Sequence, residues 1–263
     1  MPTALLDAVV PGDVAVFDAD GTVWEGDVTE SLLEDLERDR AIDLDGAPLP
    51  LPPLPGEGVF AYYLRVTSWD VPLGYQWAVQ VFAGQTVEAL TERVRALQTK
   101  RPPGRSRSAP RVRSAIADWM EAFSRRGGTS WIVSASPESL VRALALDPVY
   151  GLPLRPEHVI GVDSLWVEAD GERHSFGMQR DAGKVPHCPP GAVLTAHLRT
   201  PLTWYEGKVA AIDRWVRKTP VLVAGDSAND RPMLRRGRVG VWFGNPDDGR
   251  ADGFVSPPPG WRA

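Results

Sequence analysis

The sequence has very little cysteine and histidine. Cys188 is the only cysteine among 263 residues, and there are four histidines. A single thiol cannot form an internal disulfide and cannot supply a cluster of thiolate metal ligands. His174, His187 and His197 show no metal-ligand spacing. These shortages exclude a disulfide framework and a thiolate metal centre.

The chain also lacks long apolar runs and an excess of positive charge. No stretch approaches the roughly 18 apolar residues of a membrane span. The first residues have no basic segment ahead of an apolar one, as a secretory signal would. The net charge of −5 is opposite in sign to that expected of a nucleic-acid-binding protein. We therefore expect a cytoplasmic protein whose partners include neither membrane nor nucleic acid.

What the sequence does contain is an alternation of short apolar runs and amphipathic helical patterns. Strands that alternate with helices indicate a parallel sheet covered on both faces. One of the helices is expected to begin at Pro137, with Ser136 as its N-cap. The predicted strands are 13–18, 130–134, 158–162, 220–225 and 239–243, and the predicted helices between them are 111–126, 137–146 and 208–218.

One stretch interrupts this alternation. From about residue 27 to 98 there are several helical patterns and no clear buried strand, followed by a Pro/Arg/Ser-rich segment at 100–113 that is typical of a linker. We interpret residues 26–110 as an inserted helical module with its linker, and residues 1–25 and 111–263 as the α/β core. A hairpin is also predicted, with 165–167 and 173–175 joined around Asp170-Gly171.

Four polar pieces lie at the ends of predicted strands and helices. They are the pair Asp18 and Asp20, then Ser134, then Lys208, and last the segment that begins at Asp226. Each has an ordinary explanation alone, as a turn, a helix cap or a solvated lysine. A parallel sheet brings such positions to one edge, where ligands bind in α/β proteins. Their joint presence therefore favours a shared site.

These residue types fit phosphoryl transfer. A carboxylate is ionised at neutral pH and needs no base to attack phosphorus, but it has to approach an anionic phosphate. A hard cation such as Mg²⁺, held by oxygen ligands, reduces that repulsion. A lysine and a hydroxyl can hold the phosphoryl oxygens, and a second carboxylic acid can protonate the leaving alcohol and then activate water. The chemistry expected is an aspartyl-phosphate intermediate.

The order and spacing of the motifs DADGT (18–22), Ser134, Lys208 and GDSAND (225–230) resemble those of the haloacid dehalogenase superfamily, in its phosphoserine-phosphatase-like branch. The resemblance covers nearly the whole chain. It implies a Rossmann-like parallel sheet with an inserted helical cap. It also implies a Mg²⁺-dependent phosphatase acting on a small phosphorylated metabolite, with Asp18 as nucleophile and Asp20 as general acid and base.

The same resemblance implies further roles. Mg²⁺ is expected to be bound by Asp18, the backbone carbonyl of Asp20, and Asp226. Asp230 is expected to support these ligands without binding the metal itself. The residues expected to bind substrate or phosphate are Gly21, Thr22, Ser134, Ala135, Lys208 and Asn229. The loop after the first strand is expected to turn the backbone N–H groups of Gly21 and Thr22 toward the phosphate.

The second motif departs from that of phosphoserine phosphatases, which usually carry Ser-Gly-Gly. Here it is Ser134-Ala135-Ser136, which leaves less room near the substrate and makes phosphoserine itself less expected. It is similar to the motif of less characterised small-molecule phosphatases of this branch, including those resembling phosphorylcholine phosphatase. Asp27 stands where some members contact a substrate ammonium, and it also fits a capping box with Glu30.

Aromatic residues are frequent in the inserted module. A cluster of this kind either forms a small core, which we favour, or binds a ligand, as a cage for a quaternary ammonium or as a surface on which a sugar or base stacks. Trp24 is a separate candidate for substrate specificity because it directly follows the catalytic loop. Two rival functions stay open: a phosphotransferase or phosphomutase of the same fold, and a protein that binds a phosphorylated ligand without turnover.

Overall fold

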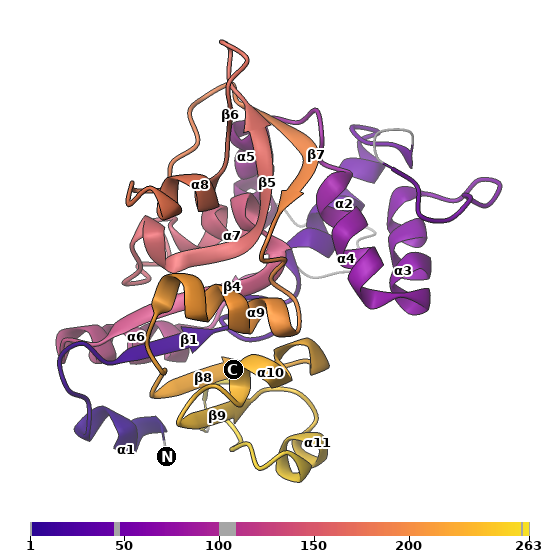
Figure 1. Ribbon diagram of the computed structural model, residues 1–263. Helices are drawn as coiled ribbons and strands as arrows, with labels where there is room; N and C mark the ends of the chain where they lie inside the picture. Colours follow the sequence, from indigo (N-terminus) through magenta and orange to yellow (C-terminus); the bar gives the residue numbers. More distant parts are fainter. Residues whose placement is uncertain (1, 45–47, 100–108, 259, 263) are drawn as a thin grey trace.

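The computed structural model describes residues 2–44, 48–99, 109–258 and 260–262 (Figure 1). Its main sheet has the order β6-β5-β4-β1-β8-β9, with β7 also paired to β5. Five neighbouring strands are parallel, which confirms the predicted α/β fold. They are β5 (Val159–Val167), β4 (Thr129–Pro137), β1 (Val14–Phe17), β8 (Leu222–Gly225) and β9 (Val239–Trp242).

Side chains along β1 alternate between the two faces of this sheet, as extended backbone requires. Ala15 and Phe17 belong to one hydrophobic cluster and Val14 and Val16 to another. The first cluster includes residues of α6 (Ser114–Arg125) and α7 (Glu138–Ala145). The second includes residues of α9 (Glu206–Ala211), the π-helical turn η3 (Ile212–Val216) and α10 (Arg231–Leu234). Both faces of the central strand are therefore covered.

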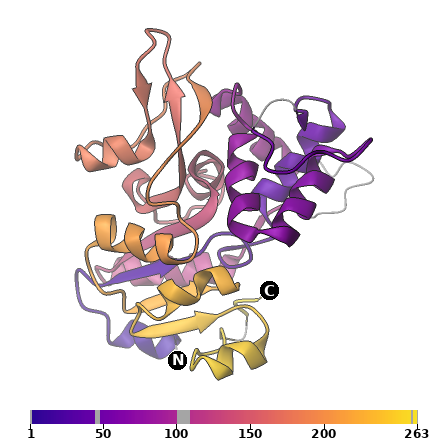
Figure 2. The same cartoon turned by 45° about the vertical axis from the view of Figure 1, so that its right-hand side comes forward.

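Among the described residues, four α-helices lie between the short strands β2 (Trp24–Glu25) and β3 (Arg111–Val112). Figures 1 and 2 show them together, in purple, beside the sheet. A short antiparallel pair connects the chain that enters this insertion with the chain that leaves it. The predicted helical insertion is confirmed, whereas its limits at residues 26 and 110 stay a prediction. The elements are α2 (Val28–Arg38), α3 (Val59–Trp69), α4 (Val71–Gln80) and α5 (Val87–Thr99), with β2 (Trp24–Glu25) and β3 (Arg111–Val112) as the pair.

The predicted linker at 100–113 lies mostly outside the described residues, because 100–108 are not among them. Within the described ranges, no helix combines the length and the apolar character needed to cross a membrane. The remaining elements are α1 (Pro2–Asp7), η2 (Pro156–His158), α8 (Phe176–Asp181), η4 (Ala228–Asp230) and α11 (Pro246–Ala251).

The far end of β5 carries two antiparallel partners. Trp166 pairs with His174 in β6 (Arg173–His174), which confirms the predicted hairpin. The strand β7 (Val193–Arg199) pairs with β5 as well and was not predicted. Most of its residues are half-buried or exposed, so its sequence lacks the apolar run by which the other strands were found. Leu194 of β7 exchanges backbone hydrogen bonds with Gly84 and Gln85, so the insertion is attached to this extension.

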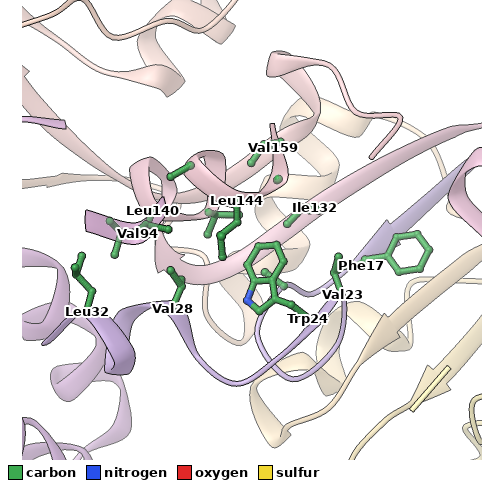
Figure 3. Close-up of a cluster of buried hydrophobic side chains, with 14 of the residues drawn as sticks. Phe17, Val23, Trp24, Val28, Leu32, Val94, Ile132, Leu140, Leu144 and Val159 are labelled. Atoms are coloured by element: carbon green, nitrogen blue, oxygen red, sulfur yellow. The ribbon is translucent and has the colours of Figure 1, made fainter. Parts of the chain in front are cut away.

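A single hydrophobic cluster joins the insertion to the sheet (Figure 3). Trp24 lies in this cluster with its side chain fully buried, near Val28 of α2 and Ile132 of β4. Val94 of α5 and Leu140 of α7 continue it. Because the helices share one core with the sheet, α2 has a fixed place beside the ends of β1 and β4.

A buried ion network holds the chain that follows the second motif. Glu138 accepts hydrogen bonds from Arg180 Nη2 at 2.6 Å, from Arg142 Nη1 at 3.3 Å and from the backbone N–H of Gly161 at 3.1 Å. The Glu138 side chain is 1% exposed. The two guanidiniums also donate to the carbonyl groups of Pro156 and Val159. The network therefore fixes the position of α7 against β5.

Replacing Glu138 with Gln tests this network. The change leaves two buried guanidiniums without their anion, so we expect the free energy of unfolding to fall by about 3–5 kcal/mol. The matched control is Glu121→Gln, which also removes the acidic member of an i,i+4 pair with an arginine, here Arg125 at the surface. That control is expected to cost less than about 1 kcal/mol. Urea unfolding measures both, and equal losses would contradict the structural role of the network.

Candidate active site

The site lies where three neighbouring parallel strands end. Asp18 follows β1, Ser134 lies in β4, and Asp226 follows β8. Since β1 pairs with both β4 and β8, the three positions lie side by side at the carboxyl edge of the sheet. Lys208 reaches the same place from α9. The residues predicted from separate parts of the sequence therefore do meet.

Lys208 is the central cation of the site. Its side chain is fully buried, and Nζ donates to Asp18 Oδ1 and Asp230 Oδ1, both at 2.5 Å. Burial alone would lower the pKa of Lys208, but the charges of these two carboxylates raise it above its ordinary value. Burial and the charge of Asp230 raise the pKa of Asp18, and Lys208 opposes that rise. The lysine therefore stays charged and orients Asp18.

Three carboxylates crowd around this lysine. One oxygen each of Asp18, Asp226 and Asp230 lie within 4.8 Å of one another. Burial, followed by the charges of Asp18 and Asp230, raises the pKa of Asp226 to about 8. The second oxygen of Asp230 accepts the backbone N–H groups of Asp226 and Ser227 at 3.0 and 3.1 Å. Asp230 is thus engaged on both oxygens, and Asp18 and Asp226 have the better placed ligand atoms.

This cluster suits a hard divalent cation. The donor set consists of carboxylate oxygens, which Mg²⁺ prefers over nitrogen or sulfur ligands. The carboxylates of Asp18 and Asp230 raise the pKa of Asp226 and Lys208 lowers it, so a further cation beside these carboxylates would favour the ionised form of Asp226. The Asp20 carboxylate is not part of this cluster of described residues, and the contact of its backbone carbonyl with a metal stays a prediction.

Asp20 has three hydrogen-bond donors on its carboxylate. Trp24 Nε1 and the backbone N–H of Val28 both donate to Oδ1 at 2.7 Å, and Ser136 Oγ donates to Oδ2 at 2.6 Å. Burial, followed by the charge of Asp27, raises the pKa of Asp20 to about 7, and the hydrogen bonds from Ser136 and Trp24 oppose that rise. A carboxyl group with this pKa can exchange a proton near neutral pH.

Gly21 and Thr22 differ from expectation. Their backbone N–H groups donate to the carbonyls of Gly26 and Ala19, both at 3.2 Å, so they are used inside the loop and not turned toward a phosphate. Thr22 is fully buried and does not line the cavity. Gly21 does line it, with φ +73, and an added Cβ would lie 2.1 Å from Asp226 Oδ2. Glycine is needed there for conformation and space.

The second motif lines the site through Ser134 and Ala135, as predicted. The hydroxyl of Ser134 accepts the backbone N–H of Ser136 at 3.1 Å, and its carbonyl accepts the hydroxyl of Thr203 at 2.6 Å. Asn229 also lines the cavity, and its Oδ1 accepts the backbone N–H of Tyr205 at 2.6 Å. That bond fixes the amide plane of Asn229.

The expected helix cap at Ser136 is not present. The helix begins at Glu138, Pro137 occupies the cap position, and no side chain caps it. The Ser136 hydroxyl is instead bonded to Asp20. Sequence reasoning missed this residue as part of the site, although the two-residue spacing from Ser134 along an extended strand places both side chains on the same side.

A cavity of about 560 Å³ opens above these groups. Its floor includes Asp18, Asp20 and Asp226, and its far wall comes from the helical insertion. The wall carries two carboxylates and two phenol rings, from Asp27, Glu30, Tyr63 and Tyr75. Glu30 and the two tyrosines were not predicted as single site residues, because no local motif distinguishes them from core or surface positions.

Asp27 caps α2 and also lines the cavity, so the predicted cap is confirmed, whereas its contact with a substrate ammonium stays a prediction. Its Oδ1 accepts the backbone N–H of Glu30 at 2.8 Å as the N-cap of α2, and its side chain also lines the cavity. Burial, followed by the charge of Glu30, raises the pKa of Asp27 to about 7. Trp24 is placed differently from the prediction. It is fully buried, it does not line the cavity, and its indole supports Asp20.

The aromatic residues of the insertion lie in three different environments. Tyr62 and Trp77 are buried with ring centroids 4.8 Å apart, as expected of a small helical core. Trp69 is 64% exposed. Tyr63 and Tyr75 are the members that reach the cavity.

Comparisons with known proteins agree with this geometry. The family model described as haloacid dehalogenase-like hydrolase matches residues 15–235. A phosphorylcholine phosphatase from Pseudomonas aeruginosa is 35% identical over 252 residues, covering 86% of this chain and 72% of that protein.

Three solved structures share the fold. A conserved functionally unknown protein from Anaerococcus prevotii has a TM-score of 0.61 at 18% identity, covering 90% of this chain and 80% of the other. A hydrolase of the same family from Salmonella enterica serovar Typhi has a TM-score of 0.57 at 13% identity, with coverages of 93% and 67%. A phospho-aspartyl intermediate analogue of phosphoserine phosphatase has 0.55 at 10% identity, with 94% and 93%. With its fold, its acidic cluster and the matched family, the chain belongs to the haloacid dehalogenase-like hydrolases and is a phosphomonoesterase of that family.

Proposed function

We propose that this chain hydrolyses a small phosphomonoester in two steps, with Asp18 as the nucleophile and Asp20 as the acid and base. The observation that carries the proposal is that Asp18 and Asp20 line one cavity, while the buried ammonium of Lys208 contacts Asp18 from beneath it. Because Lys208 engages Oδ1 of Asp18, we assign the attack to Oδ2. Lys208 then neutralises charge on the phosphoryl oxygens beside it.

In the first step a bond forms between Asp18 Oδ2 and phosphorus, and the bond from phosphorus to the leaving oxygen breaks. Asp20 gives its proton to that oxygen, so the alcohol leaves neutral. In the second step Asp20 takes a proton from water, whose oxygen bonds to phosphorus while the bond to Asp18 breaks. Phosphate is released, and both aspartates return to their starting states. The pKa of about 7 allows Asp20 to serve both steps at neutral pH.

We propose Mg²⁺ as the metal, held by Asp18, Asp226 and the backbone carbonyl of Asp20, with Asp230 fixing the loop behind them. When bound, the ion supplies positive charge that lets the carboxylate approach the phosphate. Ser134 and Asn229 line the cavity beside Asp18 and are proposed to bind the phosphoryl group. Ala135 lines the cavity next to Ser134 and is proposed to contact the substrate there.

We propose further that the leaving group carries a quaternary ammonium, as in phosphorylcholine. The cavity wall has two carboxylates and two aromatic rings, a combination that attracts such a cation through charge and through the ring faces. The similarity to a protein named phosphorylcholine phosphatase supports the same class of substrate. Asp27 and Tyr75 are the proposed contacts for the cation.

Phosphate release from a panel of phosphomonoesters tests the activity. We expect turnover that is lost on chelation and restored by Mg²⁺, and that falls at least about 1,000-fold in Asp18→Asn. The control is Asp118→Asn, which changes an exposed aspartate of α6 and is expected to keep full activity. Turnover that survives Asp18→Asn would contradict the proposal. Transfer of the phosphoryl group to an added alcohol, with no release in water alone, would favour a phosphotransferase.

A matched pair of substrates tests whether the cavity recognises a positive charge on the leaving group. Phosphorylcholine is compared with its uncharged isostere 3,3-dimethylbutyl phosphate, and we expect kcat/KM to be higher for the charged one by about 10-fold or more. Asp27→Asn keeps an N-cap residue on α2 and removes the charge. It should lower kcat/KM for phosphorylcholine by about 10-fold and leave the isostere within about twofold. Equal losses of kcat/KM for the two substrates in Asp27→Asn would show that Asp27 does not interact with the ammonium group.

A further inference from the structure

A chain of two hydroxyl groups leads from the helical insertion to Asp20. Thr29, in the first turn of α2, and Ser136, in β4, are in contact through their hydroxyl oxygens at 2.9 Å. Ser136 Oγ lies 2.6 Å from Asp20 Oδ2. Thr29 and Ser136 are 5% and 7% exposed, and both line the cavity.

The direction of these hydrogen bonds follows from the chemistry of the groups. An ionised carboxylate only accepts, so Ser136 has to donate its single hydroxyl proton to Asp20. Ser136 then has no proton left for Thr29, and Thr29 has to be the donor to Ser136. The chain therefore runs from Thr29 through Ser136 to Asp20.

This direction restricts where the acidic proton of Asp20 can lie. Oδ1 already accepts two donors, Trp24 Nε1 and the backbone N–H of Val28, and has no lone pair directed elsewhere for a proton. The proton therefore belongs on Oδ2. In the ionised form the Ser136 proton points at Oδ2, so the lone pair of Oδ2 that stays open is directed away from Ser136, toward the cavity that Asp20 lines. A proton that Asp20 takes from water in the cavity binds at this lone pair, and it therefore faces the leaving group in the next cycle.

We propose that Ser136, held by Thr29, is a positioning residue that directs the Asp20 proton toward the leaving oxygen. The inference rests on the proposed role of Asp20 as the acid. It gives the helical insertion a part in that step, because Thr29 meets Ser136 only while the start of α2 lies against β4. The loop after β1, the strand β4 and the helix α2 thus each contribute a residue that sets the position of the Asp20 carboxyl group.

Leaving-group dependence separates this role from a structural one. Expulsion of an alkoxide from phosphorylcholine needs an acid, whereas p-nitrophenolate leaves without one. The value of kcat/KM covers binding and the first chemical step, so it is not affected by the later hydrolysis of the intermediate. We expect Ser136→Ala to lower kcat/KM for phosphorylcholine about 10- to 100-fold and to leave p-nitrophenyl phosphate within about threefold.

Three further variants make the test specific. Thr29→Val keeps the shape of the side chain and removes the donor. It should also lower kcat/KM for phosphorylcholine relative to p-nitrophenyl phosphate, by a smaller factor than Ser136→Ala does. The double variant, Thr29→Val with Ser136→Ala, should have the same kcat/KM for phosphorylcholine as Ser136→Ala alone, because both changes break one chain of contacts. Ser139→Ala removes another buried serine, one that does not line the cavity, and should leave both substrates unchanged.

Asp20→Asn distinguishes failure of this inference from failure of the proposed function. If Asp20→Asn itself lowers kcat/KM equally for both substrates, Asp20 is not the acid and the proposed function is wrong at that point. If Asp20→Asn shows the leaving-group pattern and Ser136→Ala does not, the positioning role alone is overturned. Equal losses for both substrates in Ser136→Ala would likewise overturn it and leave Ser136 a structural residue.

Discussion

A lysine ammonium that is fully removed from water is stable only beside anions, and this constraint governs the whole site. Lys208 meets it with Asp18 on one side and Asp230 on the other. Because its charge is shared between two carboxylates, it cannot balance the third, and the pKa of Asp226 stays raised. The same cluster of carboxylates suits a divalent cation, and the fixed charge of Lys208 beside Asp18 suits the approach of an anionic phosphoryl group.

The contact between Asp18 and Lys208 depends on the order of the strands in the sheet. Asp18 and Lys208 are 190 residues apart in the chain, yet they touch because β1 lies between β4 and β8 and α9 packs on the same sheet. The insertion is held to the sheet by shared core residues around Trp24, and the same indole donates to Asp20. Trp24 therefore contributes both to the packing of the insertion and to the position of the Asp20 carboxylate.

Much of this arrangement was predictable from sequence, because the groups that make it stand at the ends of strands with strong apolar patterns. Asp18 and Asp226 are predicted in this way, and Lys208 is predicted from its place at the start of an amphipathic helix. The expected phosphate contacts from the N–H groups of Gly21 and Thr22 were wrong, since the loop satisfies those groups internally. No sequence pattern shows how a tight turn distributes its own hydrogen bonds.

The other differences have similar causes. Ser136 was expected to cap a helix, and the partner that draws it away, Asp20, lies 116 residues earlier in the chain. Tyr63 and Tyr75 reach the cavity, whereas Tyr62 and Trp77 form core, and all four belong to the same aromatic-rich stretch. Which face of a helix meets a cavity depends on tertiary packing. Hydrophobic periodicity alone does not contain that information.

The central claim is that the phosphoryl group passes through Asp18, and trapping that intermediate tests it most directly. The Asp20→Asn variant with p-nitrophenyl phosphate favours its accumulation, because the first step needs little acid and the second lacks its base. After an acid quench, digestion and mass spectrometry, the account predicts one added phosphoryl group on the peptide that contains Asp18. Release of p-nitrophenol and phosphate with no such adduct, or an adduct on another residue such as Ser134, would contradict it.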